Sequence, residues 1–107
     1  MNIVGNGSQS IGSLATEYTV HSTTTAGVYS FVLDTTAMAN GDTLEVKVKI
    51  KVESGGADVI AYQTIFSYLQ SDPAKISVPV IAPYGFSCSI KQTAGTVRTF
   101  PWAVASL

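Results

Sequence analysis

The sequence has little charge, very little cysteine or histidine, and no long apolar run. Asp, Glu, Lys and Arg make up 12% of its 107 residues, about half the share usual in soluble domains. The formal charge is −1, so no overall field attracts the chain to nucleic acid or to an anionic membrane. The longest apolar stretches are strand-sized, too short for a transmembrane helix or a signal peptide. We therefore expect a protein made in the cytoplasm that binds neither nucleic acid nor membrane.

The groups from which enzymes build active sites are equally scarce. The chain has one histidine and one cysteine, and it contains no GxSxG, HExxH, phosphate-loop or paired-cysteine motif. All four aspartates, which commonly cap backbone amides in such places, lie beside predicted turns: Asp34, Asp42, Asp58 and Asp72. These absences predict that the protein is not an enzyme and binds no cofactor or metal.

Three local features each allow a functional and a structural interpretation. Cys88 alternates with apolar residues, so we expect a small core residue, with a reactive thiol as the alternative. His21 ends a predicted strand and is expected to be solvated or hydrogen-bonded, with a pH-sensitive contact as the alternative. Asp34 and Asp42 flank one loop and could meet at a cation, but the loop lacks the regular ligand spacing of a calcium site. Turn capping is the expected role of both carboxylates.

The sequence does contain many strand patterns. Apolar residues alternate with charged ones from Leu44 to Glu53, the period of a strand with one buried and one solvated face. Shorter runs of similar composition, separated by turn residues, predict strands at 16–21, 28–33, 59–69, 76–81, 86–91 and 96–104. About seven strands with almost no helix predict an all-β fold. We expect an antiparallel two-sheet β-sandwich, jelly-roll-like or immunoglobulin-like.

Residues 1–15 differ from the rest of the chain. The segment MNIVGNGSQSIGSLA is rich in Gly, Ser and Asn and has no sustained period. We expect a flexible N-terminal arm followed by a single β-sandwich domain over residues 16–107. The isolated aliphatic residues of the arm, which favour docking on a neighbouring subunit, are Ile3, Val4, Ile11 and Leu14.

Three of the predicted strands carry a further signal. Pro79 and Pro101 cannot donate to a ladder, so each predicts an edge strand or a bulge. The strand at 59–69 is largely apolar on both faces, which predicts burial on both sides. One face is expected to pack on the core, and the other on a second sheet, the arm or a neighbouring subunit.

Two groups of side chains are candidate contacts with a partner. Lys47, Lys49 and Lys51 form a stripe along one strand, suited to solvation and protection of the sheet edge or, alternatively, to docking on an acidic surface. Arg98 and Trp102 share a strand face with Phe100. That group is either a cation beside core aromatics or an interface anchor.

Two strings in the sequence resemble a family of small structural proteins of tailed bacteriophages: GVYSFVLDTTAMANGDTLEVKVKIKV and IKQTAGTVRTFPWAV. The matching positions are Tyr29, Leu33, Asp34, Met38, Ala39, Gly41, Asp42, Lys91 to Thr96, Arg98, Phe100 and Trp102. The resemblance spans about two thirds of the chain, and Pro101 is not part of its pattern. It implies a component of the virion, such as a capsid decoration or cement protein, and leaves head or tail open.

The sequence therefore predicts a structural protein that stabilises a phage head by binding the major capsid protein or another virion protein. Many copies, assembled as a homo-oligomer with a trimer favoured, would make modest contacts persistent. Two alternatives remain: a carbohydrate- or receptor-binding module of a fibre, using exposed aromatic residues, and a head-to-tail or tail-tube component.

Overall fold

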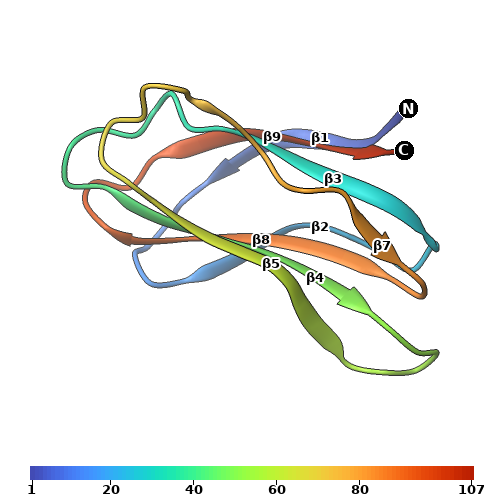
Figure 1. Ribbon diagram of the computed structural model, residues 1–107. Helices are drawn as coiled ribbons and strands as arrows, with labels where there is room; N and C mark the ends of the chain where they lie inside the picture. Colours follow the sequence, from blue (N-terminus) through green and yellow to red (C-terminus); the bar gives the residue numbers. More distant parts are fainter.

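The computed structural model describes all residues, Met1–Leu107, and consists of strands and loops without a helix (Figure 1). The nine strands are β1 (Asn2–Ser10), β2 (Glu17–Thr23), β3 (Gly27–Asp34), β4 (Thr43–Lys51), β5 (Asp58–Ser67), β6 (Ala74–Ile76), β7 (Val80–Ala82), β8 (Phe86–Ala94) and β9 (Thr99–Ser106). They form two antiparallel sheets that pack face to face. The predicted all-β sandwich is confirmed, with nine strands in place of about seven.

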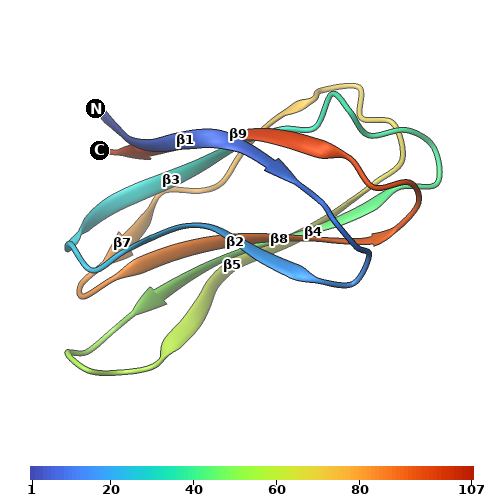
Figure 2. The same cartoon turned by 180° about the vertical axis from the view of Figure 1, so that it is seen from behind.

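The two sheets have different edges. The first sheet has the order β1-β9-β3, and the short strands β6 and β7 both pair with the remaining side of β3. The second sheet has the order β2-β8-β4-β5. Asn2 pairs with Ser106, so both termini lie at the same end of the sandwich, as the view from behind also shows (Figure 2). The edges β5 and β6–β7 lie on one side of the molecule, whereas β1 and β2 lie on the other (Figures 1 and 2).

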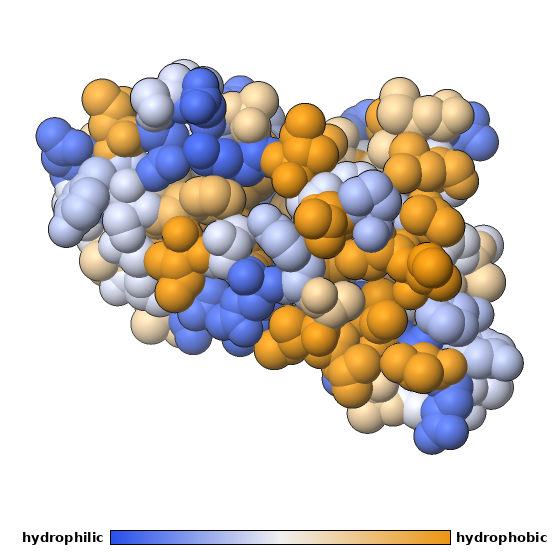
Figure 3. Space-filling model, viewed as in Figure 1, coloured by the Kyte–Doolittle hydropathy of each residue, from blue (hydrophilic) through white to orange (hydrophobic).

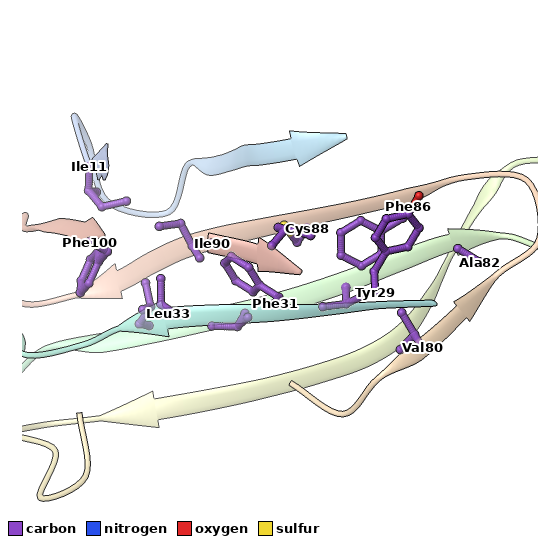
Figure 4. Packing of buried hydrophobic residues seen from close by; sticks show 14 of the residues in the cluster. Ile11, Tyr29, Phe31, Leu33, Val80, Ala82, Phe86, Cys88, Ile90 and Phe100 are labelled. Carbon is purple, nitrogen blue, oxygen red and sulfur yellow. The ribbon is translucent and has the colours of Figure 1, made fainter. Parts of the chain in front are cut away.

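The core lies between the sheets and is built from side chains that point inward from strands of both sheets (Figure 4). Leu44, Val46 and Val48 of β4 are all buried, as the period-two pattern predicts. The rings of Tyr29 and Phe86 stack across the core with their centroids 4.8 Å apart. Apolar burial of this kind is the main stabilising term, at about 25 cal/mol for each Å² removed from water.

The N-terminal segment is part of the sandwich, so the expectation of an arm outside the domain is wrong for most of it. Strand β1 pairs antiparallel with β9 from Asn2 to Ser10, with a bulge at Val4. Gly5 and Gly7 lie close to the indole ring of Trp102: a Cβ at Gly7 would lie 3.4 Å from its Nε1. Small residues therefore let this strand cross the ring closely. Because these residues lack large side chains, the segment also shows no apolar period.

Pro79 behaves as predicted. It falls in the break between β6 and β7, which together form the edge of the sheet beside β3. Ser77 fills the break: its backbone N–H donates to the Phe31 carbonyl, and its hydroxyl oxygen accepts from the Phe31 N–H at 2.9 Å. The Ser30 hydroxyl donates to the Ser77 carbonyl in return. A serine thus completes the ladder where the proline interrupts the strand.

Pro101 is a partial correction, because β9 is an interior strand of its sheet. Ile11 donates its N–H to the Arg98 carbonyl, and bonded and non-bonded pairs alternate along an antiparallel ladder. The nitrogen of Pro101 therefore points away from β1, toward β3. Pairing between β3 and β9 begins only at Leu33 and Trp102. The missing donor lies just beyond that ladder, so the position is an edge locally although the strand is not.

Strand β5 is not buried on both faces within the single chain. Its inward side chains Tyr62, Thr64 and Phe66 are half-buried, while Ile65 on the outer face is 58% exposed. No other part of the chain covers that outer face. The prediction that the chain's own second sheet or N-terminal segment covers it is wrong, because both sheets pack on the same inner core and β1 lies at the far edge.

Candidate interaction surface

Exposed apolar side chains gather at the end of the sandwich where β4 ends, β5 begins and β7 leads into β8. Backbone hydrogen bonds hold these segments together: Lys51 donates to the Gly85 carbonyl at 3.0 Å, and Tyr84 donates to the Lys51 carbonyl at 3.2 Å. The residues, 47% to 71% exposed, are Val52, Val59, Ile60, Ile81 and Tyr84. We call them the apolar end surface. Figure 3 shows apolar side chains gathered over β7 and the beginning of β5.

Exposed apolar side chains often mark sites of interaction. Strand alternation directs two of these residues to different faces: Ile60 shares the outer face of one sheet with Lys49, and Ile81 shares the outer face of the other sheet with Val28. The residues come from the β4–β5 hairpin, from β7 and from the β7–β8 turn. A shallow hollow lies in the hairpin, lined by Val52, Glu53 and Val59 among others. Glu53 is the one charged residue of this hollow. The apolar end surface can therefore bind a partner mainly through apolar contact.

The lysine stripe is engaged within the chain. Lys47 Nζ lies 3.3 Å from a Glu17 carboxylate oxygen and 3.1 Å from one of Glu45, and Lys49 Nζ lies 3.4 Å from Glu17. Burial alone would raise the pKa of Glu17, but the hydrogen bond from Lys47 and the charge of Lys49 hold it below its ordinary value. Hydrogen bonds to Glu45 and Glu17 raise the pKa of Lys47. Of the stripe, Lys51 alone makes no ion pair.

The pairing favours one of the two interpretations of the stripe. Two of its three cations are matched by carboxylates of neighbouring strands, since Lys47 and Lys49 on β4 meet Glu17 on β2. A partner with an acidic surface would have to displace these carboxylates. The stripe therefore supports solvation and local pairing better than docking.

The opposite end of the sandwich is closed by a network around Asp42, which is buried. One carboxylate oxygen accepts from the Thr96 N–H at 3.0 Å; the other accepts from the Ala39 N–H at 2.9 Å and from Arg98 Nε at 3.0 Å. Burial works to raise the pKa of Asp42, but these donors hold it below its ordinary value. The two sequence strings that carry the family resemblance meet at this network. Asp42 of the first string thus joins its own loop to the turn at Thr96 of the second.

Two neighbouring residues complete the network. Gln92 is fully buried, donates to the carbonyls of Ala94 and Thr96, and accepts from the Arg98 N–H. Gly95 has a φ of +91°, and a Cβ there would lie 2.0 Å from an Asp42 carboxylate oxygen. Only glycine combines that backbone conformation with so close an approach. The string QTAGTVR therefore describes a structural turn.

Trp102 and His21 pack together on the β1–β2 side of the sandwich. Their rings lie 5.9 Å apart at an angle of 46°, and a Cβ at Gly5 would lie 2.6 Å from His21 Nδ1. His21 lies within β2 and not at a loop end, and its buried Nε2 has no hydrogen-bond partner in the chain. Trp102 is half-buried against the core. Both residues thus support the packing of β1.

The residues predicted to contact a partner are therefore dispersed. In the N-terminal segment Ile3, Val4 and Leu14 are exposed, but Ile11 is 4% exposed and belongs to the core. Ile11 is thus not available to a partner of this folded chain. Arg98 is tied to Asp42, and Trp102 lies under β1. The structure does not bring these residues together into one surface.

The structure contains no group of three or more His, Cys, Asp or Glu side chains placed to hold a metal ion. Asp34 accepts from the backbone N–H and hydroxyl of Thr36, as turn capping predicts. Cys88 is buried in the core, as predicted, and burial raises the pKa of its thiol to about 12 although a hydrogen bond from the His21 backbone opposes the shift. No helix is long and apolar enough to span a membrane.

Comparison with known proteins gives no match: neither a family model, nor a curated protein sequence, nor a solved structure is similar to this chain. The structure itself defines the class, an all-β two-sheet sandwich. Function is therefore inferred from the surfaces described above.

The apolar end surface was not predicted from the sequence. Ile81 and Tyr84 flank proline-containing turns, and Val52 continues the alternating pattern beyond the end of β4 at Lys51. A pattern that assigns Val52 to a strand face also assigns it to the core. One sequence signal could have revealed this surface: apolar residues are frequent around Ser54–Gly56 and Pro83, although turns do not require apolar residues.

Proposed function

We propose that this chain is a non-catalytic structural protein of a tailed-phage virion that decorates the head and stabilises it by binding the major capsid protein. The observation that carries the proposal is the apolar end surface on a small, weakly charged sandwich. Ile81, at 71% exposed, and Val52, at 60% exposed, are its most open side chains. Covering such residues removes apolar area from water, and repetition over many copies makes modest contacts persistent.

The distribution of charge supports apolar contact as the binding mode. The chain has a formal charge of −1, and Lys47 and Lys49 are matched by carboxylates of the same chain. Electrostatic attraction therefore contributes little to an encounter. Binding that rests on apolar burial should persist at high ionic strength, where exposed charges are screened.

The carbohydrate-binding alternative needs exposed aromatic side chains close to one another. Tyr68 and Tyr84 are the exposed tyrosines, at 57% and 49%. Tyr68 follows β5 beside the Thr43 end of β4, whereas Tyr84 bonds to Lys51 at the other end. Eight residues of strand, about 27 Å, separate these ends. The two rings form no common platform, which favours the decoration role over this alternative.

The test is to purify particles that carry the chain, count its copies and locate it by electron microscopy. We expect many copies on the outer surface of the head, with the apolar end surface against the capsid protein. Density in a fibre or in the tail, or a particle without the chain, would contradict the proposal.

A binding experiment with substituted chains gives the residue-level test. Ile81→Lys places a charge in the apolar end surface and should weaken binding to heads that lack the chain by at least about tenfold, or about 1.4 kcal/mol. Val97→Lys is the matched control, because Val97 is also exposed and lies at the opposite end, beside Arg98. Equal binding by both variants would place the contact elsewhere.

A further inference from the structure

Each sheet has two edges, and three of the four edges carry features that discourage pairing with another strand. On one side, β6 and β7 contain three residues each and are separated by Pro79. Edge β2 carries Glu17 and His21, and edge β1 carries Gly5 and Gly7 with a bulge. Short strands, prolines, charges and bulges are the usual means by which edges avoid pairing.

Edge β5 also has a bulge, but it keeps an uninterrupted stretch of strand beyond it. Its register with β4 shifts between Val48 and Lys49, which leaves Ala61 as an extra residue and divides the strand. The stretch beyond this bulge, Tyr62–Ser67, reads YQTIFS. It has no charge, no proline and no glycine, and its aromatic and β-branched residues favour extended structure. Six residues of this composition on an open edge are suited to pairing with another strand.

Hydrogen bonding to β4 shows which backbone groups of this stretch are free. Tyr68 donates its N–H to the Asp42 carbonyl at 2.7 Å. Because bonded and non-bonded pairs alternate in an antiparallel ladder, Gln63, Ile65 and Ser67 direct their N–H and C=O groups away from β4. The Ser67 carbonyl agrees with this, since it accepts from the side chain of Gln70 at 2.7 Å. Gln63 and Ile65 keep both groups open.

We propose that β5 pairs antiparallel with β5 of a second copy of this chain and joins the two four-stranded sheets into one. Gln63 of each copy lies opposite Ile65 of the other, and these residues exchange about four backbone hydrogen bonds. This register satisfies the free groups and leaves the Ser67 carbonyl with Gln70. It also places the side chain of Gln63 of the other copy beside Ile65 on the outer face.

A second copy fits this edge because the pairing is self-complementary. A two-fold axis through the paired strands places no charged residue of Tyr62–Ser67 against another, and each copy has a formal charge of only −1. A two-fold contact uses one edge of each chain and closes on itself. The proposed pairing therefore gives a dimer, in place of the trimer expected from the sequence.

Analytical ultracentrifugation over a concentration series tests the association. We expect reversible dimerisation of the unsubstituted chain. Ile65→Lys, at an exposed position, should raise the dissociation constant at least about tenfold through repulsion across the axis. Ile81→Lys is the control: the same substitution at a more exposed position of β7 should leave dimerisation unchanged.

Cross-linking tests the register. Opposite residues in a bonded pair lie about 5.5 Å apart between Cα atoms, within reach of a disulfide. An equimolar mixture of Gln63→Cys and Ile65→Cys chains should form a disulfide-linked dimer faster than either chain alone or than an Ile81→Cys chain. The native Cys88 is buried and does not compete.

Two results would overturn the inference: a chain that sediments as a monomer up to about millimolar concentration, where even weak pairing would show, or a dimer that Ile65→Lys leaves intact. Failure of this test and failure of the proposed function are distinguishable. Ile65→Lys should weaken the dimer while the apolar end surface remains, and Ile81→Lys should weaken head binding while the dimer remains.

Discussion

At the scale of single residues, Gly95 beside Asp42 is the glycine with the least room for a side chain. A carboxylate occupies the space that a Cβ of residue 95 would need, and the backbone of Gly95 has a positive φ. That carboxylate accepts hydrogen bonds from two loops and from Arg98. Steric and electrostatic requirements thus coincide at one point, and a change at either residue affects the other.

Gly95→Ala should therefore be strongly destabilising. The new methyl group displaces the Asp42 carboxylate and the residue is held at an unfavourable φ, so we expect the free energy of unfolding to fall by at least about 3 kcal/mol. Gly55→Ala is the matched control: Gly55 has a φ of +73° with nothing within 4 Å of a Cβ, so its cost should be about 1 kcal/mol. Urea denaturation of both variants gives the comparison, and equal losses would contradict it.

The depressed pKa of Asp42 predicts an acid-sensitive contribution to stability. Its folded pKa lies below the ordinary value of 3.8, so the unfolded chain binds more protons near that pH. The contribution is complete above pH 3.8 and is lost as the pH falls through the folded pKa. Asp42→Asn should cost about 2 kcal/mol at pH 7 and reduce the dependence on pH below 4.

Denaturation curves of this variant at pH 7 and at pH 3 measure both effects. Asp58→Asn is the control, since Asp58 is exposed, starts β5 and makes no ion pair. It should change the free energy of unfolding by less than about 0.5 kcal/mol. An Asp42→Asn chain that is no less stable at pH 7 would show that the network contributes nothing.

At the scale of elements, the N-terminal segment is the least expected part of the fold. Strand β1 pairs with β9 along its length, and the residue that follows it, Ile11, enters the core. A backbone hydrogen bond from Ile11 to Arg98 continues the ladder beyond the strand. The segment therefore covers one side of Trp102 and contributes a core side chain.

Ile11→Ala should consequently cost about 2–4 kcal/mol in the free energy of unfolding, because truncation of a buried isoleucine leaves a cavity. Leu14→Ala removes a side chain of similar size from the same segment at 41% exposure, and should cost less than about 1 kcal/mol. Thermal or chemical denaturation of both variants measures the difference. A mobile segment would give small and similar losses in the two variants.

At the scale of the whole molecule, pairing connects segments that are far apart along the chain. Strand β1 pairs with β9, and β2 pairs with β8. Such contacts require closure of long loops before they become favourable. Both terminal strands depend on this closure, so the sandwich is completed only when the two ends of the chain meet.

Refolding should therefore be slow for a domain of 107 residues. All-β sandwiches of this kind fold in about milliseconds to seconds. Stopped-flow fluorescence of Trp102, the single tryptophan, reports the step because β1 packs over its ring. Phe100 lies on the inner face of the same strand and is fully buried. The Phe100→Leu variant changes this core residue but keeps Trp102 as the fluorescent reporter, so it serves as the control. A microsecond refolding phase with full amplitude would contradict this prediction.

Much of the architecture followed from local chemistry alone. The alternation at Leu44–Glu53, the turn residues between strands and the position of Pro79 are properties of neighbouring residues, and they predict strands, loops and a sandwich without knowledge of strand order. The burial of Cys88 followed from the same period. The residues of the expected interface could not be predicted as well from the sequence, because ion pairing of Lys47 and burial of Ile11 depend on residues distant in sequence.

The sequence by itself determined the class of fold and the scarcity of reactive groups, because hydrophobic period and composition act locally. Only the tertiary structure decided that β1 belongs to a sheet, that the Asp42 loop meets the Gly95 turn, and that β5 remains an open edge. These outcomes depend on which strands become neighbours. That choice minimises exposed apolar area and unpaired backbone groups over the whole chain, and no short stretch contains it.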